Sequence, residues 1–228
     1  MQYGWKKQLL TYAGVCALLF AAPMASEAVS ITNTTYGTAD ASVFERMFEV
    51  SGVGERITDV DILINFSKCD DPAPGPGDAN CLGGDFSFNR EIDLLLTSPS
   101  GTAVSLVIED TYDGQTPGAR VVVTFDDEAT TPVGGSRLQS GSFQPVSLLS
   151  AFDGEDPNGI WTLRVTDTVG ADPLQFYCGV LGINEAPTST DAACTTVSSA
   201  VPEPSTYAMF LTGLGALFAY ARRRRWQR

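Results

Sequence analysis

The feature that most constrains how this chain can fold is an alternation of apolar and polar side chains that recurs through its middle. In residues 92–97, an isoleucine or leucine occupies every second position from Ile92 onward. Successive residues of a strand point to opposite faces, so a period of two indicates a strand with one buried face. Other segments with this alternation or with high strand propensity are 43–50, 60–66, 104–108, 120–125, 161–166 and 174–183.

Short segments rich in glycine, proline, asparagine and aspartate separate the predicted strands. They are 98–101, 113–114, 134–135 and 156–159. No segment of helical periodicity lies between the strands, which argues against a parallel sheet with crossover helices. We therefore predict that residues 29–186 form one antiparallel β-sandwich. Trp161 shares a face with Leu163 and Val165, so it is predicted to pack in the core.

The first 28 residues have the features of a secretory signal peptide. Lys6 and Lys7 precede the uncharged apolar run 9–22, and small residues follow it. This order is typical of a helix that directs export and is then removed. Cleavage is expected after Ala28, because it places the small Ser26 at position −3. An uncleaved N-terminal anchor is the alternative.

A second apolar segment lies near the C-terminus. Residues 206–221 carry no charge, and an arginine cluster follows at once: Arg222, Arg223, Arg224 and Arg225. A helix of this length would span ~24 Å, which is short for a bilayer core of ~30 Å. Arginines beside a membrane helix stay on the cytoplasmic side, so the body of the protein is expected outside the inner membrane.

This C-terminal segment resembles the PEP-CTERM sorting signal. It has the motif Pro202-Glu203-Pro204, then the short apolar helix, then the arginine cluster. The resemblance implies processing by an exosortase near the motif and release to the surface or exterior of a Gram-negative bacterium; an ordinary single-pass anchor is the alternative. The expected divisions are a signal peptide (1–28), a sandwich (29–186), a linker (187–201) and a sorting signal (202–228).

Four cysteines lie in the part expected outside the cell: Cys69, Cys81, Cys178 and Cys194. An even number in an exported protein indicates two disulfides. Of the three possible pairings we predict Cys69–Cys81 and Cys178–Cys194, since each closes a short loop beside a strand. The first would close an exposed loop, rich in proline and glycine, at 70–80. A zinc site is the alternative, but the closely spaced cysteine pairs of such sites are absent.

Three segments of the body resemble the P domain of proprotein convertases: Asn89–Thr102, Phe125–Ala129 and Phe152–Leu163. In convertases this domain follows a subtilisin-like protease and stabilises it, and it is also attached to other secreted bacterial proteins. The resemblance implies a jelly-roll sandwich. The predicted fold is therefore an all-β, antiparallel, jelly-roll-like β-sandwich, flanked by an N-terminal signal helix and a C-terminal transmembrane helix.

The chain contains no histidine. This excludes Ser-His-Asp and Cys-His catalysis and histidine-ligated metals. The protease that accompanies P domains is not expected, because residues 29–50 are too few to form one. A glycosidase needs only two carboxylates, and pairs among Asp126, Asp127, Asp153 and Glu155 are conceivable, but their spacing does not favour one. We predict a protein that is not an enzyme and has no catalytic residues.

Acids that gather at the ends of predicted strands are candidate calcium ligands, because calcium prefers six to eight hard oxygen atoms. The candidates are Asp93, Asp126, Asp127, Asp153, Glu155 and Asp156. Calcium is accordingly the one cofactor expected. The alternative is that these acids only form turns, cap strands and keep the protein soluble.

A formal net charge of −13 disfavours binding to nucleic acid or anionic lipid. We predict a non-enzymatic surface or matrix protein, which its sorting signal associates with exopolysaccharide or biofilm. Its expected partners are the exosortase and either an extracellular polysaccharide or another surface protein. One alternative is a carbohydrate-binding module that uses exposed aromatic residues, for which the candidates are Tyr112, Phe143, Phe176 and Tyr177. Another is an accessory P-type domain that acts with a secreted serine endopeptidase.

Overall fold

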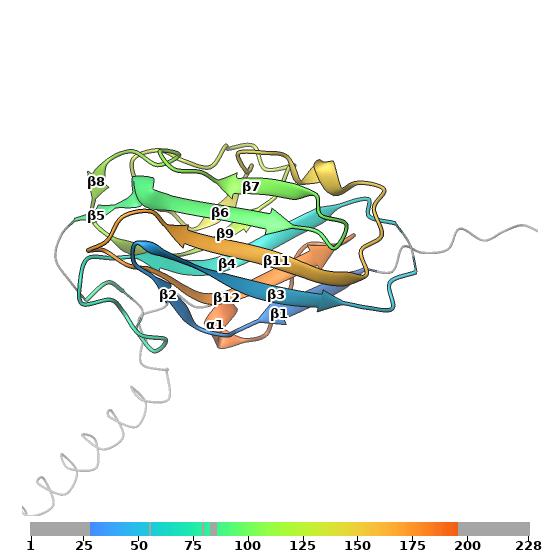
Figure 1. The fold of residues 1–228 in the computed structure, drawn as a ribbon, viewed down its shortest axis with the longest axis horizontal. Coiled ribbons are helices and arrows are strands. Elements are labelled where there is room, and N and C mark those ends of the chain that lie inside the picture. Colours follow the sequence, from blue (N-terminus) through green and yellow to red (C-terminus); the bar gives the residue numbers. More distant parts are fainter. Residues whose placement is uncertain (1–27, 55, 79, 83–85, 196–228) are drawn as a thin grey trace, which may run out of the picture.

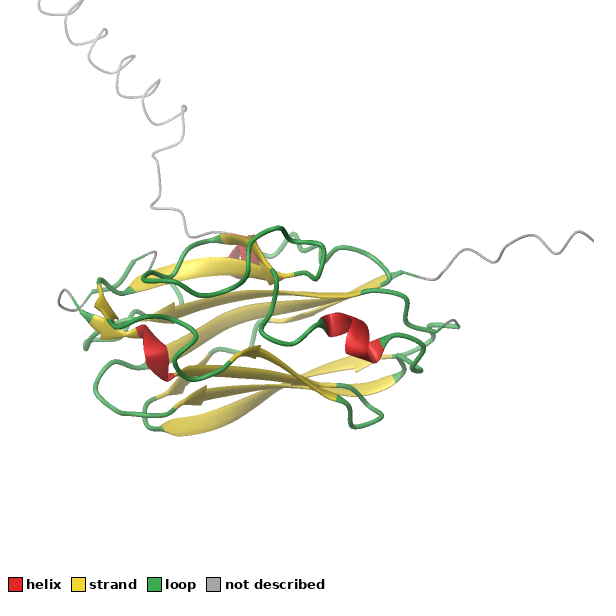
Figure 2. Cartoon of the chain, turned by 90° about the horizontal axis from the view of Figure 1, so that it is seen from above, coloured by secondary structure: helices red, strands yellow, loops and turns green. Residues whose placement is uncertain are grey.

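The computed structural model describes residues 28–195, apart from residues 55, 79 and 83–85. In these residues two β-sheets pack face to face, and Figure 2 shows the two layers. The strands of the first sheet are, in order, β1 (Val29–Asn33), β12 (Leu174–Ile183), β4 (Val60–Lys68), β9 (Ala119–Phe125) and β10 (Gly141–Phe143), and β2 (Gly37–Ala39) also pairs with β12. The strands of the second sheet are, in order, β3 (Ser42–Val50), β11 (Gly159–Asp167), β6 (Ile92–Thr97) and β7 (Ala103–Val107).

Smaller elements connect and flank these sheets. They are the two-stranded sheet of β5 (Ser87–Phe88) and β8 (Gln115–Thr116), the 3₁₀ helices η1 (Asn89–Glu91) and η2 (Leu149–Phe152), and the short helix α1 (Ala192–Thr195). The predicted all-β class is confirmed, since the described helices are single turns at strand ends and in connections (Figure 1).

The strand order is that of a jelly roll. When the eight main strands are numbered along the chain, the first sheet reads 1-8-3-6 (β1, β12, β4, β9) and the second reads 2-7-4-5 (β3, β11, β6, β7). This order interlocks two Greek keys. One pairing departs from the antiparallel prediction, because β10 joins the edge strand β9 in parallel.

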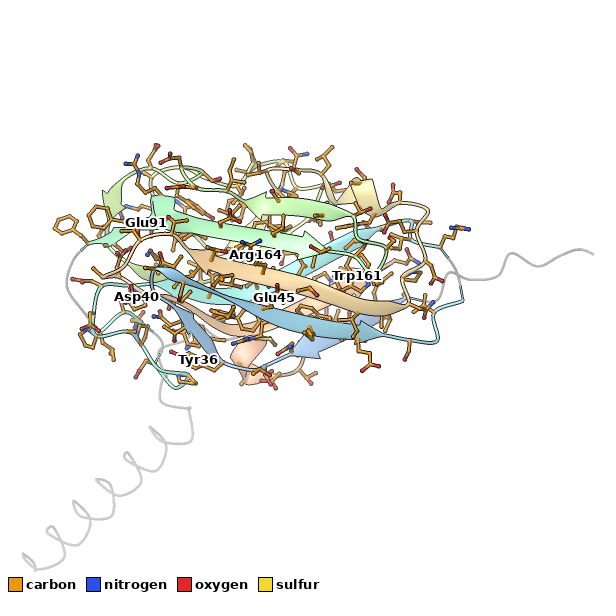
Figure 3. The ribbon with its side chains drawn as sticks, viewed as in Figure 1. Tyr36, Asp40, Glu45, Glu91, Trp161 and Arg164 are labelled. Carbon is orange, nitrogen blue, oxygen red and sulfur yellow. A yellow bond between two sulfur atoms is a disulfide. The ribbon has the colours of Figure 1, made fainter. Side chains whose placement is uncertain are left out.

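The core lies between the two sheets and follows from the alternation in the sequence. Val60, Ile62, Ile64 and Phe66 of β4 all lie in the core cluster and are at most 2% exposed. Trp161 lies near the start of β11, an inner strand of the other sheet, and is completely buried. Figure 3 labels it on β11. The core packing predicted for this residue is confirmed.

The Trp161 side chain is held by one ring contact and one hydrogen bond. Its ring meets that of Phe152 edge to face, with the centroids 4.9 Å apart. Its indole nitrogen donates to the carbonyl oxygen of Pro157 at 2.9 Å. Because the buried N–H has a partner, the residue can occupy the core without the cost of an unsatisfied donor.

All seven predicted strands are present, but one side-chain register was wrong. The alternation at 104–108 placed Ile108 on the buried face. In the structure β7 ends at Val107, which is buried, whereas Ile108 is exposed. A register shift between Leu94 and Leu95 in the pairing of β6 with β7 explains this, since a bulge reverses the face on which the next residue lies.

Both predicted disulfides, Cys69–Cys81 and Cys178–Cys194, are confirmed. The loop that Cys69–Cys81 closes was predicted to be exposed. In the structure it is also bonded to side chains of the first sheet. Tyr177 donates from its hydroxyl to the carbonyl oxygen of Pro74 at 3.0 Å, and Arg120 donates to that of Pro76 at 3.3 Å. These bonds hold the loop against the outer face of the first sheet.

The sandwich continues beyond the predicted boundary at residue 186. Cys194 of α1 is completely buried and bonded to Cys178 of β12. Asn65 of β4 donates to the carbonyl oxygen of Ala193 at 2.7 Å. The first part of the predicted linker 187–201 is therefore attached to the first sheet, and residues 196–201 lie outside the described part of the chain.

Both predicted flanking helices also fall outside the described residues, apart from Ala28 at the end of the predicted signal peptide. Within the described residues, none of the helices has the length and apolar character needed to cross a membrane.

Candidate functional site

Four acidic side chains gather where β4 begins and β9 ends. Val60 and Ile62 of β4 face the core, so Asp61 between them faces the outer side of the first sheet. Ile62 pairs with Phe125, the last residue of β9, so the acidic residues that follow Phe125 emerge beside Asp61. We call Asp59, Asp61, Asp126 and Glu128 the acidic cluster.

The oxygens of three of these side chains converge. Single carboxylate oxygens of Asp59, Asp61 and Glu128 lie within 4.8 Å of one another. Asp59 is half-buried, Asp61 is buried and Glu128 is exposed, so the cluster reaches from below the surface to the solvent. Such an arrangement can present several hard oxygens to one ion from one side.

Asp61 is buried because the chain after β12 folds back beside it. Its partner across the sheet is Gly182 of β12. The space that a side chain at Gly182 would need is taken by the backbone of Glu185 and Pro187. Asp61 is left only 6% exposed, and its Oδ1 atom has no hydrogen-bond partner among the described residues.

The electrostatics of Asp61 reflect this burial. Its pKa is raised to about 7, chiefly by the loss of water and then by the negative charges of Asp59, Asp126, Glu128 and Asp127. The pKa of Asp59 is raised for the same reasons, with burial the largest. The pKa of Glu128 is raised chiefly by its hydrogen bond with the carboxyl group of Asp126. The charged groups that act most strongly on Asp61 are all acids. The carboxylates of the acidic cluster therefore repel one another when they are ionised.

Three of the six predicted calcium ligands lie at or near this cluster. Asp126 is a member, and Asp127 and Asp153 are close enough to raise the pKa of Asp59. However, both carboxylate oxygens of Asp127 are engaged, because they accept hydrogen bonds from the backbone of Leu149 and Ser150 at 2.9 and 2.8 Å. Asp127 therefore holds the first turn of η2.

The other three predicted ligands lie elsewhere, and two of them accept hydrogen bonds that shape turns. Glu155 accepts hydrogen bonds from the hydroxyls of Ser98, Ser100 and Thr102, which outweigh its burial and lower its pKa. Asp156 accepts from the backbone of Asn158 at 2.9 Å, which lowers its pKa and forms the turn before β11.

Asp93 lies on β6 of the second sheet, where burial raises its pKa and the charge of Arg164 opposes that shift. The six predicted ligands are thus not brought together in one site.

A second group of acids, none of them among the predicted ligands, surrounds a completely buried lysine. Lys68 Nζ lies 3.0 Å from Glu91 Oε2, 2.8 Å from Asp167 Oδ2 and 3.3 Å from Asp172 Oδ2. Burial is the largest influence on Lys68 and lowers its pKa, but its hydrogen bonds and charge partners together raise it. Burial also raises the pKa of Asp167 to about 6.

This lysine and the acidic cluster lie at opposite ends of β4, since Asp61 is near its start and Lys68 is its last residue. Figure 3 labels Glu91 at the lysine end of the sandwich. Because the lysine group is closed to solvent and each acid contacts the ammonium, we assign it a structural role.

The aromatic residues proposed to stack on sugars do not form an exposed platform. Tyr112, Phe176 and Tyr177 are at most 3% exposed, and Phe143 is half-buried against the core. The guanidinium of Arg120 lies 3.6 Å from the centroid of the Tyr177 ring. These four residues serve packing rather than a sugar-binding face.

The chain matches two family models. The model described as the proprotein convertase P-domain matches residues 85–177, and the model described as the PEP-CTERM protein-sorting motif matches residues 200–225. The second match contains Pro202, Glu203, Pro204 and the arginines 222–225, which lie outside the described residues. No curated protein matches the chain significantly.

Among solved structures, the serine protease of Aeromonas sobria is similar at 13% identity with a TM-score of 0.33. The alignment covers 72% of this chain but only 28% of the protease chain, and so low a score supports no inference. Export and C-terminal processing by an exosortase follow from the sorting motif. The family models thus find a proprotein convertase P-domain over residues 85–177 of the body and a PEP-CTERM protein-sorting motif over residues 200–225 behind it.

Proposed function

We propose that this protein is a non-catalytic β-sandwich that acts at the cell surface or in the extracellular matrix after an exosortase has removed its tail. The observation that carries the proposal is the placement of the sorting motif directly behind a closed domain. The Cys178–Cys194 disulfide and the Asn65–Ala193 hydrogen bond fix the chain up to α1, whereas the motif begins at Pro202. Cleavage at the motif would remove no described strand.

The proposed role outside the cell is structural or adhesive, with an extracellular polysaccharide or another surface protein as the partner. The P-domain match supports a non-catalytic role, since this domain accompanies catalytic domains without itself being one. The absence of histidine from the sequence supports the same role. The two disulfides suit a protein that works in an oxidising environment.

The sorting step is tested in the native host by replacing Pro202-Glu203-Pro204 with three alanines. We expect the full-length chain to accumulate in the membrane fraction and the mature protein to disappear from the medium. The matched control replaces Thr196-Val197-Ser198 with alanines, three residues outside the motif, and should leave release unchanged. Equal release of the motif variant would contradict the proposal.

The partner is tested with mature protein collected from the medium. We expect it to sediment with exopolysaccharide purified from the same host, and a protein of similar charge and size should stay in the supernatant. If it stays in the supernatant with purified polysaccharide and also with intact cells, the adhesive role is wrong.

A second candidate function is favoured by the P-domain match alone. An isolated P-type domain could bind and stabilise a secreted serine endopeptidase encoded elsewhere. In that case the protein should co-purify from the medium with serine endopeptidase activity. Deletion of its gene should then shorten the lifetime of that activity in the medium.

A further inference from the structure

We propose that Asp59, Asp61 and Glu128 form a binding site for a calcium ion on the outer face of the first sheet, where β4 begins and β9 ends. The inference is independent of the proposed function, since it concerns the folded domain rather than its sorting or partner. It rests on two observations: the convergence of three carboxylate oxygens within 4.8 Å, and the buried carboxylate of Asp61 with an unpartnered oxygen.

In the part of the chain that the structure describes, Asp61 differs from the other buried acids in having no positive partner. Four acidic side chains in the described residues are buried: Asp61, Glu91, Asp167 and Asp172. Three of them contact the ammonium of Lys68, whereas no salt bridge to a lysine or arginine is found for Asp61 among the described residues. A buried carboxylate without a positive partner is strongly unfavourable. A bound cation would supply the missing charge.

The spacing of the three carboxylates suits one calcium ion. Ligand oxygens lie 2.3–2.6 Å from calcium, so two ligands on opposite sides of one ion are about 4.8 Å apart. The oxygens of Asp59, Asp61 and Glu128 fall within that span. They come from two segments that are distant in sequence, the start of β4 and the turn after β9, so a bound ion would join these segments.

The chemistry of the donors favours calcium over other metals. All three side chains offer hard carboxylate oxygens, and neither histidine nor free thiol is among them. Magnesium requires near-ideal octahedral geometry at 2.0–2.1 Å and gives up its waters reluctantly. Calcium accepts an irregular shell, and the exposed position of Glu128 leaves room for water molecules to complete it.

The test measures calcium binding to the full chain in detergent after metal is removed with a chelator. Titration calorimetry with calcium chloride should give a dissociation constant of about 10⁻⁴–10⁻³ M, the range of extracellular calcium modules. Calcium should also raise the melting temperature, and magnesium at the same concentration should raise it less.

Variants assign the site. Asp61→Asn keeps the side-chain shape and should weaken calcium binding at least tenfold, while the melting temperature in chelator rises because repulsion is removed. Asp93→Asn is the matched control: it makes the same chemical change on the second sheet, and it should bind calcium like the unmodified protein. Glu128→Gln, at an exposed position, should weaken binding and provides the test should Asp61→Asn fail to fold.

Two results would overturn the proposal. One is the absence of any calorimetric or thermal response to calcium up to about 10 mM, well above the expected range. The other is a response that Asp61→Asn and Glu128→Gln leave unchanged, which would place the ion elsewhere.

Discussion

The ammonium group of Lys68 lies 2.8 Å from the carboxylate of Asp167, and neither side chain is more than 1% exposed. Lys68 continues the inward-facing series of β4, so its charge enters the region between the sheets where Ile64 and Phe66 supply the core. Asp167 is the last residue of β11, on the opposite sheet. The pair therefore joins the two sheets at one end of the sandwich, with Glu91 and Asp172 completing the group.

Replacement of Lys68 should strongly destabilise the domain. Lys68→Met keeps much of the side-chain volume but leaves buried carboxylates without a positive partner. We expect the free energy of unfolding to fall by about 3–5 kcal/mol in urea denaturation. The control is Arg90→Met, which breaks the exposed ion pair with Asp110 at 3.1 Å and should cost at most about 1 kcal/mol. Similar losses in the two variants would show that the buried group is not specially important.

The acidic cluster predicts how stability depends on pH when calcium is absent. In the folded state Asp61 holds its proton up to about pH 7, whereas its ordinary pKa is 3.8. The folded state thus binds more protons between these values, so the free energy of unfolding should fall as pH rises from about 4 to 7. At about 1.4 kcal/mol per pKa unit, Asp61 contributes at most ~4 kcal/mol to this fall.

The pKa of Asp167 is raised to about 6, so this residue also makes the free energy of unfolding fall as pH rises. The contribution of Asp61 is therefore measured as a difference between the unmodified protein and a variant. Denaturation of the Asp61→Asn variant in chelator, from pH 4 to 8, should show a shallower fall than the unmodified protein. Asp59, Asp126, Asp127 and Glu128 surround Asp61 and remain in both proteins. Parallel curves for the two proteins would contradict the assignment.

Glu155 is expected to contribute to the stability of the fold and not to calcium binding. It accepts hydrogen bonds from three hydroxyls in the turn between β6 and β7, whereas a glutamine has one carbonyl oxygen and a donor in place of the second. Glu155→Gln should lower the free energy of unfolding by about 1–3 kcal/mol. Asp156→Asn should be nearly neutral, because asparagine forms the same turn. Calcium titration should not distinguish either variant from the unmodified protein.

The Cys178–Cys194 disulfide should protect the C-terminal end of the domain. Its partners are 16 residues apart, and a loop of this size corresponds to about 3 kcal/mol in the chain-entropy account. A variant with both cysteines replaced by alanine should lose about that amount. Limited proteolysis should then cut between residues 184 and 194, where the unmodified protein resists. Equal resistance of both proteins would show that the hydrogen bond from Asn65 suffices.

Side-chain alternation and strand propensity were enough to predict seven of the eight main strands. β12 is buried along both faces, so its strand propensity marked it rather than an alternation. The short edge strands β1, β2 and β10 were missed, since three to five residues carry too little pattern. The register of Ile108 was missed because a bulge depends on the pairing of β6 with β7 and leaves no mark on the periodicity.

The acidic cluster could be predicted from the sequence only in part, for a similar reason. Asp126 was identified from the run of acids after β9. Asp59 and Asp61 are far from it in sequence, and only the pairing of β4 with β9 brings them together. One available signal was the unusual Asp61 at an outward position near the start of a strongly apolar strand. Lys68 was missed for a related reason, because its partners come from β11, η1 and the turn before β12.

The most direct test of the account is the mass of the mature protein taken from the medium of the native host. We expect a chain that begins at Val29, ends near Pro202, and is lighter by the four hydrogens of two disulfides. It should contain none of the arginines 222–225. An intact C-terminus ending at Arg228 in the released protein would contradict the proposal that a closed, exported sandwich is freed by removal of its sorting tail.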